Sequence, residues 1–284
     1  MPRRLPVTSY PLWLASPLVL AMLFFFVAPL GVLGVVSFYG DAAMTQWGSG
    51  VNWAKMFDGF GLGVLADTLR LGLEVTLLSL VLGYALAWVY VRMPPSLQPF
   101  VIFVIMLPLL TSVVVRTFAW IVILGRQGIV NNVLMDLGWI SAPLKLLYTR
   151  TGLVVALANV QLPLMVLPLI TALSNIDPAL RQASLALGAG RWRTFVQVTL
   201  PLSLPGIIAG CLLTFAAAIT AFISQSLIGG GQMLFMPMYL YQQASALSNY
   251  PFAAAISLTF LATVIVCVSV FNLLGRLSRG YSTQ

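Results

Sequence analysis

The stretches LPGIIAGCLLTFAAAITAFIS at residues 204–224 and FAAAISLTFLATVIVCVSVFNLL at residues 252–274 decide the class of fold. Each reaches the roughly 20 apolar residues that cross a bilayer as an α-helix, and no charged residue occurs from Thr194 to Gly275. Neither stretch alternates apolar and polar residues as the strands of a membrane β-barrel do. We predict two transmembrane helices here, separated by a polar segment rich in Gly, Gln and Ser at residues 225–250.

The composition of the whole chain is also strongly apolar. Of its 284 residues, 60% are hydrophobic and 7% are charged, and the mean hydropathy is +1.01. A soluble domain carries roughly 25% charged residues, so a large soluble enzyme domain, a nucleic-acid-binding module and a disordered tail are all excluded. The expected environment is a lipid bilayer, and the net charge of +8 is interpreted as a set of topology markers rather than as a nucleic-acid patch.

Four further apolar runs lie near residues 12–38, 69–91, 100–124 and 152–173. We therefore predict an all-α polytopic membrane protein with six transmembrane helices and both termini on the same side. An excess of basic residues marks the cytoplasmic side of membrane proteins. With the N-terminus inside, the cytoplasmic segments hold Arg3, Arg4, Arg92, Arg181, Arg191, Arg193, Arg276 and Arg279, and the outer segments hold Lys55, Arg70, Arg126, Lys145 and Arg150. This bias favours cytoplasmic termini.

The sequence offers little material for catalysis or metal binding. It contains no histidine, which is the commonest general base and metal ligand. Its two cysteines, Cys211 and Cys267, lie in apolar runs and are expected to be small buried hydrophobic residues. An intramembrane enzyme is therefore disfavoured. An ion-coupled secondary transporter, which usually needs carboxylates within its spans, has only Glu74 available and stays as the alternative function.

The polar segment NIDPALRQASLALGAGRWRTFVQVTLP at residues 175–201 predicts two short helices between the fourth and fifth spans. Asp177 is a suitable N-cap, Pro178 suits the first helical position and Gly188 suits the left-handed residue after a helix. A second helix is expected after Gly190 and is expected to stop at Pro201. A helix of about ten residues is marginal alone, so the first needs either the bilayer surface or the groove of a partner.

The run QASLALGA at residues 182–189, followed by Leu200-Pro201 and by PGI at 205–207, resembles the EAA loop of binding-protein-dependent ABC importer permeases. Two residues depart from that pattern, because Gln182 replaces the acidic first residue and Ser184 replaces the second alanine. The resemblance extends over about residues 50–275. The runs LPLLTSVVVRTFAW at 107–120, LGRQGIVN at 124–131 and LPLMVLP at 162–168 are similar to the spermidine/putrescine permease branch.

This resemblance implies a type I ABC importer permease in a bacterial cytoplasmic (inner) membrane. It divides the chain into residues 1–66 (a first transmembrane helix and an extracytoplasmic loop), 67–275 (the transmembrane domain with coupling loop 175–201) and 276–284 (a cytoplasmic tail). It implies a second permease, two ATPase subunits and an extracytoplasmic solute-binding protein as partners. The chain lacks a Gly-x-x-x-x-Gly-Lys-Ser/Thr phosphate loop, so ATP and Mg²⁺ are expected on the ATPase. The residues implied in ATPase coupling are Gln182, Ala183, Ser184, Leu187, Gly188 and Ala189.

The resemblance suggests a polyamine as substrate, and three residues in the predicted spans are candidates for the translocation path: Glu74, Arg116 and Trp120. At 1.5 Å per residue, Glu74 lies roughly 8 Å and Arg116 roughly 12 Å below the same membrane edge. A lone charge in hydrocarbon is costly, so we expect the two to pair or to line one vestibule. Alternatively, Glu74 reaches the headgroups and Arg116 snorkels or bonds to loop carbonyls.

Overall fold

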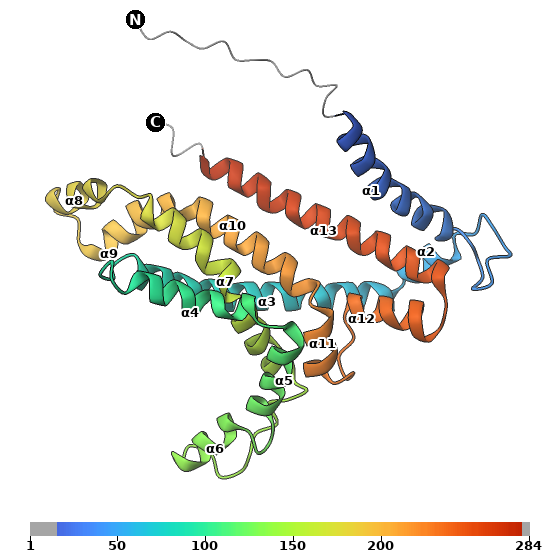
Figure 1. Ribbon diagram of the computed structural model, residues 1–284, viewed down its shortest axis with the longest axis horizontal. Coiled ribbons are helices and arrows are strands. Elements are labelled where there is room, and N and C mark those ends of the chain that lie inside the picture. The colour runs from blue at the N-terminus through green and yellow to red at the C-terminus, as the bar shows by residue number, and fades with distance from the viewer. Residues whose placement is uncertain (1–15, 280–284) are drawn as a thin grey trace, which may run out of the picture.

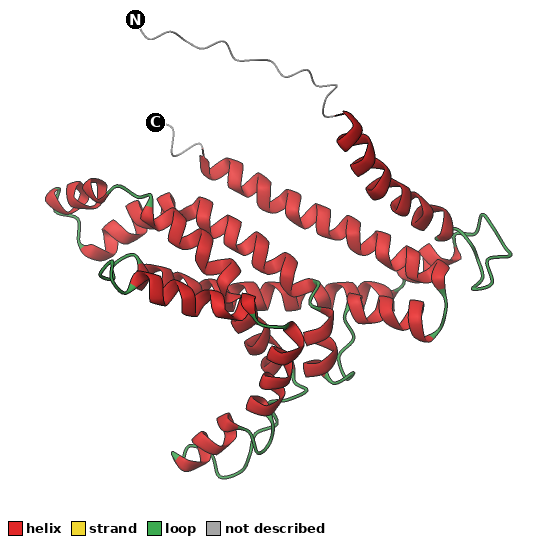
Figure 2. Cartoon of the chain, in the orientation of Figure 1, coloured by secondary structure: helices red, strands yellow, loops and turns green. Residues whose placement is uncertain are grey.

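The computed structural model describes residues 16–279, and these residues are almost entirely helical (Figure 2). Within them, β-structure is limited to one isolated bridge between Tyr39 and Trp47. Residues 12–15 of the first predicted span, Arg3 and Arg4, and residues 280–284 of the predicted tail lie outside the described part of the chain. The prediction of an all-α protein is confirmed.

Most connections between the helices are short, and the two long ones are residues 37–50 and 137–149. Their bounds are α1 (Ser16–Val36), α2 (Val51–Met56), α3 (Gly59–Tyr90), α4 (Gln98–Leu110), α5 (Val113–Leu124), α6 (Ile129–Asp136), α7 (Arg150–Ser174), α8 (Pro178–Ala186), α9 (Arg191–Thr194), the π-helical turn η2 (Phe195–Thr199), α10 (Leu200–Ile219), α11 (Phe222–Gly229), α12 (Met236–Tyr241), the π-helical turn η3 (Gln242–Ala246) and α13 (Tyr250–Arg279).

The long helices α3, α7, α10 and α13 run along the longest axis of the molecule (Figure 1). The short helices α8 and α9 lie at one end of this bundle and α2 and α12 lie towards the other, while α5 and α6 extend away from its side. Six helical stretches are long and apolar enough to cross a membrane: residues 16–36, 59–90, 113–136, 150–174, 191–219 and 250–273. The number of spans therefore agrees with the prediction.

Helix α7 forms the centre of the bundle, packed against both α3 and α10. Its Met165 is fully buried between two glycines. A Cβ added at Gly83 of α3 would lie 2.8 Å from Met165 Cγ, and one added at Gly210 of α10 would lie 2.8 Å from Met165 Sδ. Small residues let membrane helices approach closely, where van der Waals packing replaces the hydrophobic effect as the source of stability.

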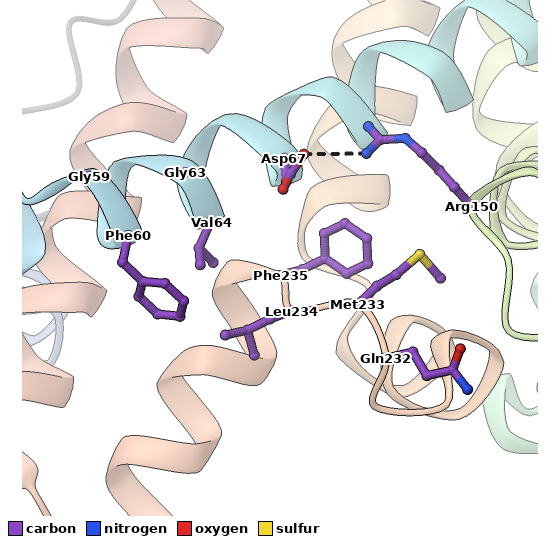
Figure 3. A pocket seen from close by; sticks show the side chains of 10 residues that line it. All are labelled: Gly59, Phe60, Gly63, Val64, Asp67, Arg150, Gln232, Met233, Leu234 and Phe235. Atoms are coloured by element: carbon purple, nitrogen blue, oxygen red, sulfur yellow. Dashed lines mark hydrogen bonds and ion pairs between the residues drawn. The ribbon is translucent and has the colours of Figure 1, made fainter.

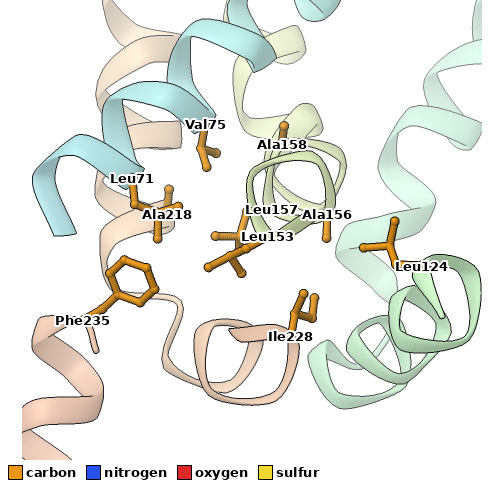
Figure 4. Packing of buried hydrophobic residues seen from close by; sticks show 10 residues of the cluster. All are labelled: Leu71, Val75, Leu124, Leu153, Ala156, Leu157, Ala158, Ala218, Ile228 and Phe235. Atoms are coloured by element: carbon orange, nitrogen blue, oxygen red, sulfur yellow. The ribbon is translucent and has the colours of Figure 1, made fainter. Parts of the chain in front are cut away.

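A buried apolar cluster joins this centre to the side of the bundle (Figure 4). Leu71 and Val75 of α3 meet Leu153 and Leu157 of α7, and Leu124 brings in α5. Because helices α3, α5, α7, α10 and α11 all contribute residues to the cluster, it fixes the end of α7 at which α5 and α11 join. The remaining members are Ala156, Ala158, Ala218, Ile228 and Phe235.

Helix α1 has the opposite character, because it has no buried residue at all. Phe24, Phe25 and Phe26 are 67%, 77% and 67% exposed. So much exposed aromatic surface is incompatible with water but is ordinary for a helix that faces lipid.

The second span begins ten residues before the predicted position. We predicted it from about residue 69, two residues after Asp67, but α3 begins at Gly59. The Asp58 side chain caps this start by accepting the N–H groups of Phe60 and Gly61 at 3.0 and 2.9 Å. The helix thus begins before Asp67 and includes it. Residue 66, the boundary predicted for the N-terminal region, lies inside α3.

The prediction of one continuous third span over residues 100–124 is wrong. The chain breaks between α4 and α5, where Thr111 is extended with φ −98° and ψ 151°. The Thr111 hydroxyl donates to the carbonyl of Pro108 at 3.1 Å, which is the acceptor that the N–H of Ser112 would use in a continuing helix. The stretch of sufficient length for a span is instead residues 113–136, with a turn between α5 and α6.

The fifth span ends before the predicted residue 224, because α10 stops at Ile219. The buried amide of Gln225 donates to the carbonyls of Ala218 and Ile219 at 2.9 and 3.3 Å. These two carbonyls are among those left unpaired by the end of the helix. The fourth and sixth spans are confirmed, as α7 covers residues 150–174 and α13 covers residues 250–279.

Candidate functional site

The segment between α7 and α10 forms two short helices, as its sequence predicts. Asp177 caps the first, because its Oδ1 accepts the N–H of Ala179 at 2.8 Å, and α8 begins at Pro178. The carboxylate satisfies a backbone donor that has no partner within the helix, and proline costs no hydrogen bond in the first turn. The predicted start of α8 is confirmed.

The end of α8 is a Schellman motif around Gly188. The N–H of Gly188 donates to Leu185 O at 3.0 Å and the N–H of Ala189 donates to Ser184 O at 3.1 Å, which is the pair of bonds that defines this motif. Gly188 has φ +82°, a left-handed conformation that costs residues with a Cβ roughly 1–2 kcal/mol. The predicted left-handed glycine is confirmed.

The second short helix does not stop at Pro201, so that prediction is wrong. Helix α9 passes through η2 directly into α10, and the N–H of Leu200 bonds to Phe195 O, five residues back. A proline inside an α-helix lacks a donor and clashes with the carbonyl four residues back. The wider π turn just before Pro201 shifts the hydrogen-bond pattern at this point, so the helix continues past the proline.

The surface of this loop exposes apolar side chains. Leu187 is 88% exposed and Trp192 is 76% exposed. Gln182 and Ala183 are also exposed, whereas Ser184 and Ala189 are half-buried. Of the residues implied in coupling, Gln182, Ala183, Leu187 and the left-handed Gly188 are thus exposed, whereas Ser184 and Ala189 are partly covered.

Two contacts connect α8 and α9 to the bundle. Ser184 Oγ and Thr194 Oγ1 lie 3.0 Å apart and share a hydrogen bond, which joins the two short helices. The ring of Phe195 packs edge-on against Trp88 of α3, with centroids 5.0 Å apart. A displacement of α8 would therefore be transmitted to α3 and α10.

A second group of polar residues lies where α7 begins beside the first half of α3. Arg150 Nε donates to Glu74 Oε2 at 2.7 Å, and Arg150 Nη1 lies 3.4 Å from Asp67 Oδ1. Arg70 Nε donates to the other Glu74 oxygen at 3.1 Å. We call these four residues the Arg150 cluster. Two carboxylates and two guanidinium groups leave it with no net charge.

A cavity of about 360 Å³ opens beside this cluster (Figure 3). Asp67 and Arg150 border it on one side, with their ion pair drawn as a dashed line, and Phe60 and Phe235 contribute aromatic walls. The Asp67 side chain is 59% exposed. Because Arg150 lines the cavity together with Asp67, the charged part of its lining is balanced.

The predicted pairing of Glu74 with Arg116 is wrong. Both Glu74 oxygens are used by Arg70 and Arg150, and within residues 16–279 the Nε and Nη1 atoms of Arg116 are buried without a hydrogen-bond partner. The prediction placed Arg150 in a loop. Arg150 is instead the first residue of α7, and its guanidinium binds the Glu74 carboxylate in place of Arg116.

The other translocation-path candidates lie on α5. Arg116 is half-buried, and Trp120 packs against the cluster of Leu71 and Leu153. The hydroxyls of Thr117, on the same helix, and Ser224, on α11, lie 3.1 Å apart and are both buried. No observation assigns these residues to a path, so their role stays a prediction.

The sequence did not predict the Arg150 cluster, nor that Arg92, Arg181 and Arg191 line one cavity. Arg150 and Glu74 are 76 positions apart, and spacing within one helix gives no sign of such a contact. One signal was available, because Arg150 stands at the very edge of the fourth apolar run, where a long side chain can reach a carboxylate in a neighbouring span.

The family described as "Binding-protein-dependent transport system inner membrane component" matches residues 79–282. The match runs from the middle of α3 through the α8–α9 loop to the end of α13. This chain belongs to that family. It is accordingly a multi-pass protein of the inner membrane and a permease component of a binding-protein-dependent transport system.

Relatives support the same assignment. The permease is 32% identical over 226 residues to the spermidine/putrescine transport system permease protein PotB of Escherichia coli K12, covering 80% of this chain and 82% of that protein. It is 32% identical over 215 residues to the molybdenum transport system permease protein ModB of the same organism, covering 75% of this chain and 92% of that protein.

The fold is also found in a solved transporter. A crystal structure of the bacterial alginate ABC transporter, in complex with a periplasmic protein bound to an alginate pentasaccharide, contains a chain with a TM-score of 0.75 and 19% identity, covering 93% of this permease and 94% of that chain. The permease therefore has the fold of an ABC importer permease.

Proposed function

We propose that the permease forms the membrane path of an ATP-driven importer for polyamines such as spermidine or putrescine. The observation that carries this proposal is the capped α8 helix, whose exposed end at Leu187 and Gly188 has the form of a docking element, in a chain similar to PotB over 80% of its length.

The partners in this proposal are those expected of the family to which the permease belongs. It has no phosphate loop, so two ATPase subunits supply ATP hydrolysis and hold the ATP and Mg²⁺. A second permease, identical or homologous, completes the path, and an extracytoplasmic protein delivers the solute. Both termini and the α8–α9 loop then lie on the cytoplasmic side, in agreement with the arginine bias.

Coupling in this proposal runs through the exposed end of α8. The residues Gln182, Ala183, Ser184, Leu187, Gly188 and Ala189 sit in or beside a groove of the ATPase. Closure of the ATPases displaces α8, the Ser184–Thr194 hydrogen bond moves α9 with it, and the unbroken α9–η2–α10 helix carries the movement into the fifth span. Alternate opening of the path to the two sides follows.

The test is uptake by cells that lack this gene and carry it again on a plasmid. Radiolabelled putrescine, spermidine and molybdate are compared, because PotB and ModB are equally identical to the permease. We expect polyamine uptake that requires ATP and an ATPase that co-purifies with the tagged permease. Uptake of molybdate alone would overturn the substrate. Uptake that follows an ion gradient, with no co-purifying ATPase, would overturn the importer.

A further inference from the structure

Three arginines from separate elements line one cavity at the α8–α9 end of the bundle. Arg92 follows α3, Arg181 lies on α8 and Arg191 begins α9, and together they border a space of about 390 Å³. The other residues around it are Trp88, Leu185, Thr194, Phe195 and Thr199. None of these described lining residues is acidic. We call this cavity the arginine pocket.

The protein itself holds these guanidinium groups only in part. Arg92 stacks on the ring of Trp88, with Cζ 3.3 Å from the centroid, and Arg92 Nη1 donates to Trp88 O at 3.0 Å. Arg181 Nη2 reaches Leu173 O at 3.4 Å, whereas its Nε is buried and has no partner within the described residues. Burial and the nearby Arg181 charge lower the pKa of Arg92.

Converging cations with no carboxylate among them repel one another, and a partner anion would remove that cost. The Arg150 cluster in the same chain shows the alternative, because there each guanidinium has a carboxylate within 3.4 Å. The arginine pocket therefore has the electrostatics of a site that is completed by an anion from outside the chain.

The pocket continues into an apolar groove of about 950 Å³. Trp88, Arg191 and Phe195 line both spaces. From there the groove follows α3 and α10 into the membrane-spanning part of the bundle, where its walls are Leu80, Val81, Tyr84, Ala85, Leu200 and Ile207. An anion alone would occupy the pocket and leave this groove unused.

We propose that the arginine pocket and the groove together bind one anionic phospholipid, with its phosphate among the three arginines and an acyl chain along α3 and α10. Basic pockets between transmembrane helices are known to hold anionic headgroups, and Trp192, 76% exposed beside the groove, is of the type that sits at the membrane interface. The proposal depends on the membrane location of the permease and not on its solute.

The lipid connects this site to coupling. Arg181 and Arg191 lie on α8 and α9, so a phosphate bound between them and Arg92 would tie both short helices to the end of α3. The Ser184–Thr194 and Trp88–Phe195 contacts would then be supported by a bridge of opposite charge. We expect an anionic bilayer to increase transport.

The experiment is native mass spectrometry of the full permease, purified with its co-purifying subunits and exposed to phosphatidylglycerol and phosphatidylcholine. We expect phosphatidylglycerol to be retained in preference. Arg92→Gln, Arg181→Gln and Arg191→Gln should each weaken its binding about fivefold, since a basic residue near an anionic lipid contributes about a factor of five. Arg193→Gln is the matched control, because Arg193 is exposed on α9, bonds to Gln197 and lines neither space.

A second variant separates a lipid from other anions. Ala85→Trp fills the groove and leaves all three arginines in place, so it should weaken phosphatidylglycerol binding as an arginine variant does. Arg92→Lys keeps the charge and should bind more tightly than Arg92→Gln. Size-exclusion profiles check that each variant is folded.

Three outcomes would overturn the proposal. Equal retention of the two lipids would remove the phosphate contact. Displacement of the bound lipid by inorganic phosphate, with no effect of Ala85→Trp, would indicate a free anion. Arginine variants that keep phosphatidylglycerol but lose the ATPase or the second permease would show that an acidic residue of a partner protein occupies the pocket.

Discussion

The two groups of charged residues along α3 are built differently. The Arg150 cluster, beside the first half of the helix, balances two carboxylates against two guanidinium groups within 3.4 Å. The arginine pocket, at the end of the same helix, gathers three guanidinium groups and no carboxylate from the described residues around it. The charges of the first group are balanced within the chain, whereas the described residues around the second supply no carboxylate.

The two regions also differ in how far their apolar side chains are buried. Near the start of α3, Met56, Met236 and Phe252 are fully buried in a compact cluster. In the α8–α9 loop, Leu187 and Trp192 are more than three-quarters exposed. A region that lacks internal partners for both its charges and its apolar side chains is typical of a surface that works in a complex.

The largest effect is expected at the end of α8. Gly188→Val places a β-branched residue at φ +82°, which costs roughly 1–2 kcal/mol and favours a different end of the helix. Polyamine uptake should fall roughly tenfold while the permease still inserts. Gly190→Val is the matched control, because Gly190 has an ordinary φ of −65° and nothing lies within 4 Å of a Cβ at either glycine. Equal uptake by the two variants would contradict the coupling role of Gly188.

A smaller effect is expected from breaking the Arg150 cluster. Glu74→Gln leaves the Arg150 and Arg70 guanidinium groups without their shared carboxylate, and we expect a loss of about 1–2 kcal/mol, seen as a thermal unfolding midpoint a few degrees lower. Asp67→Asn should have less effect, since Asp67 is 3.4 Å from Arg150 and 59% exposed. In the double variant Glu74→Gln with Arg150→Gln, part of the loss should return. Strictly additive losses would show that the two residues do not act as a pair.

Gln182→Glu is expected to change the amount of co-purifying ATPase only a little. Gln182 is exposed on α8, and an exposed charge contributes at most about 1 kcal/mol. The amount of ATPase that co-purifies should stay within about threefold of the wild type and depend only weakly on salt. Gln127→Glu adds the same charge to an exposed position in the turn after α5 and serves as the control. Much greater resistance of the Gln182→Glu complex to a high-salt wash would show that the ATPase presents a cation there.

The smallest effect concerns the loop between α1 and α2, where Asp41 is again satisfied within the chain. Its carboxylate accepts bonds from the Thr45 hydroxyl and the backbone N–H of Gln46, and these lower the pKa of Asp41. A lowered folded pKa means that the loop is stabilised above pH 3.8, the ordinary value, and loses this contribution as the pH falls through the folded pKa. The Thr45 and Gln46 amides should exchange hydrogen faster in Asp41→Asn at neutral pH, with no change at Asn52. Unchanged exchange would contradict the carboxylate's role.

The sequence predicts those features that depend on local signals. Apolar length gives the number of spans and the all-α class, and Asp177, Pro178 and Gly188 fix both ends of α8 because capping depends on neighbouring residues. The sequence does not predict the break at Thr111, because there a hydroxyl competes for a carbonyl inside an apolar run. Nor does it predict the Arg150 cluster, since that depends on how α3 and α7 pack.

The candidate site residues also differ in whether the sequence predicts them. The residues for which we predict a coupling role could be named from the sequence because they follow one another in one loop. The arginine pocket was missed because Arg92 and Arg181 lie 89 positions apart (181 − 92) and meet only after α8 turns back towards the end of α3. The wrong pairing of Glu74 and Arg116 has a related cause, because depth in the membrane does not tell which faces of two helices meet.

The π turn η2 also sets the rotational phase between α9 and α10. A π turn uses one more residue than an α turn, and one residue corresponds to about 100° around a helix axis. Deleting a single residue within Phe195–Thr199 would keep the helix continuous but rotate everything before it, so that Thr194 would turn away from Ser184 and α8 would face a new direction. The direction in which the exposed side of α8 faces therefore depends on the number of residues between Trp192 and Pro201 as well as on their identity.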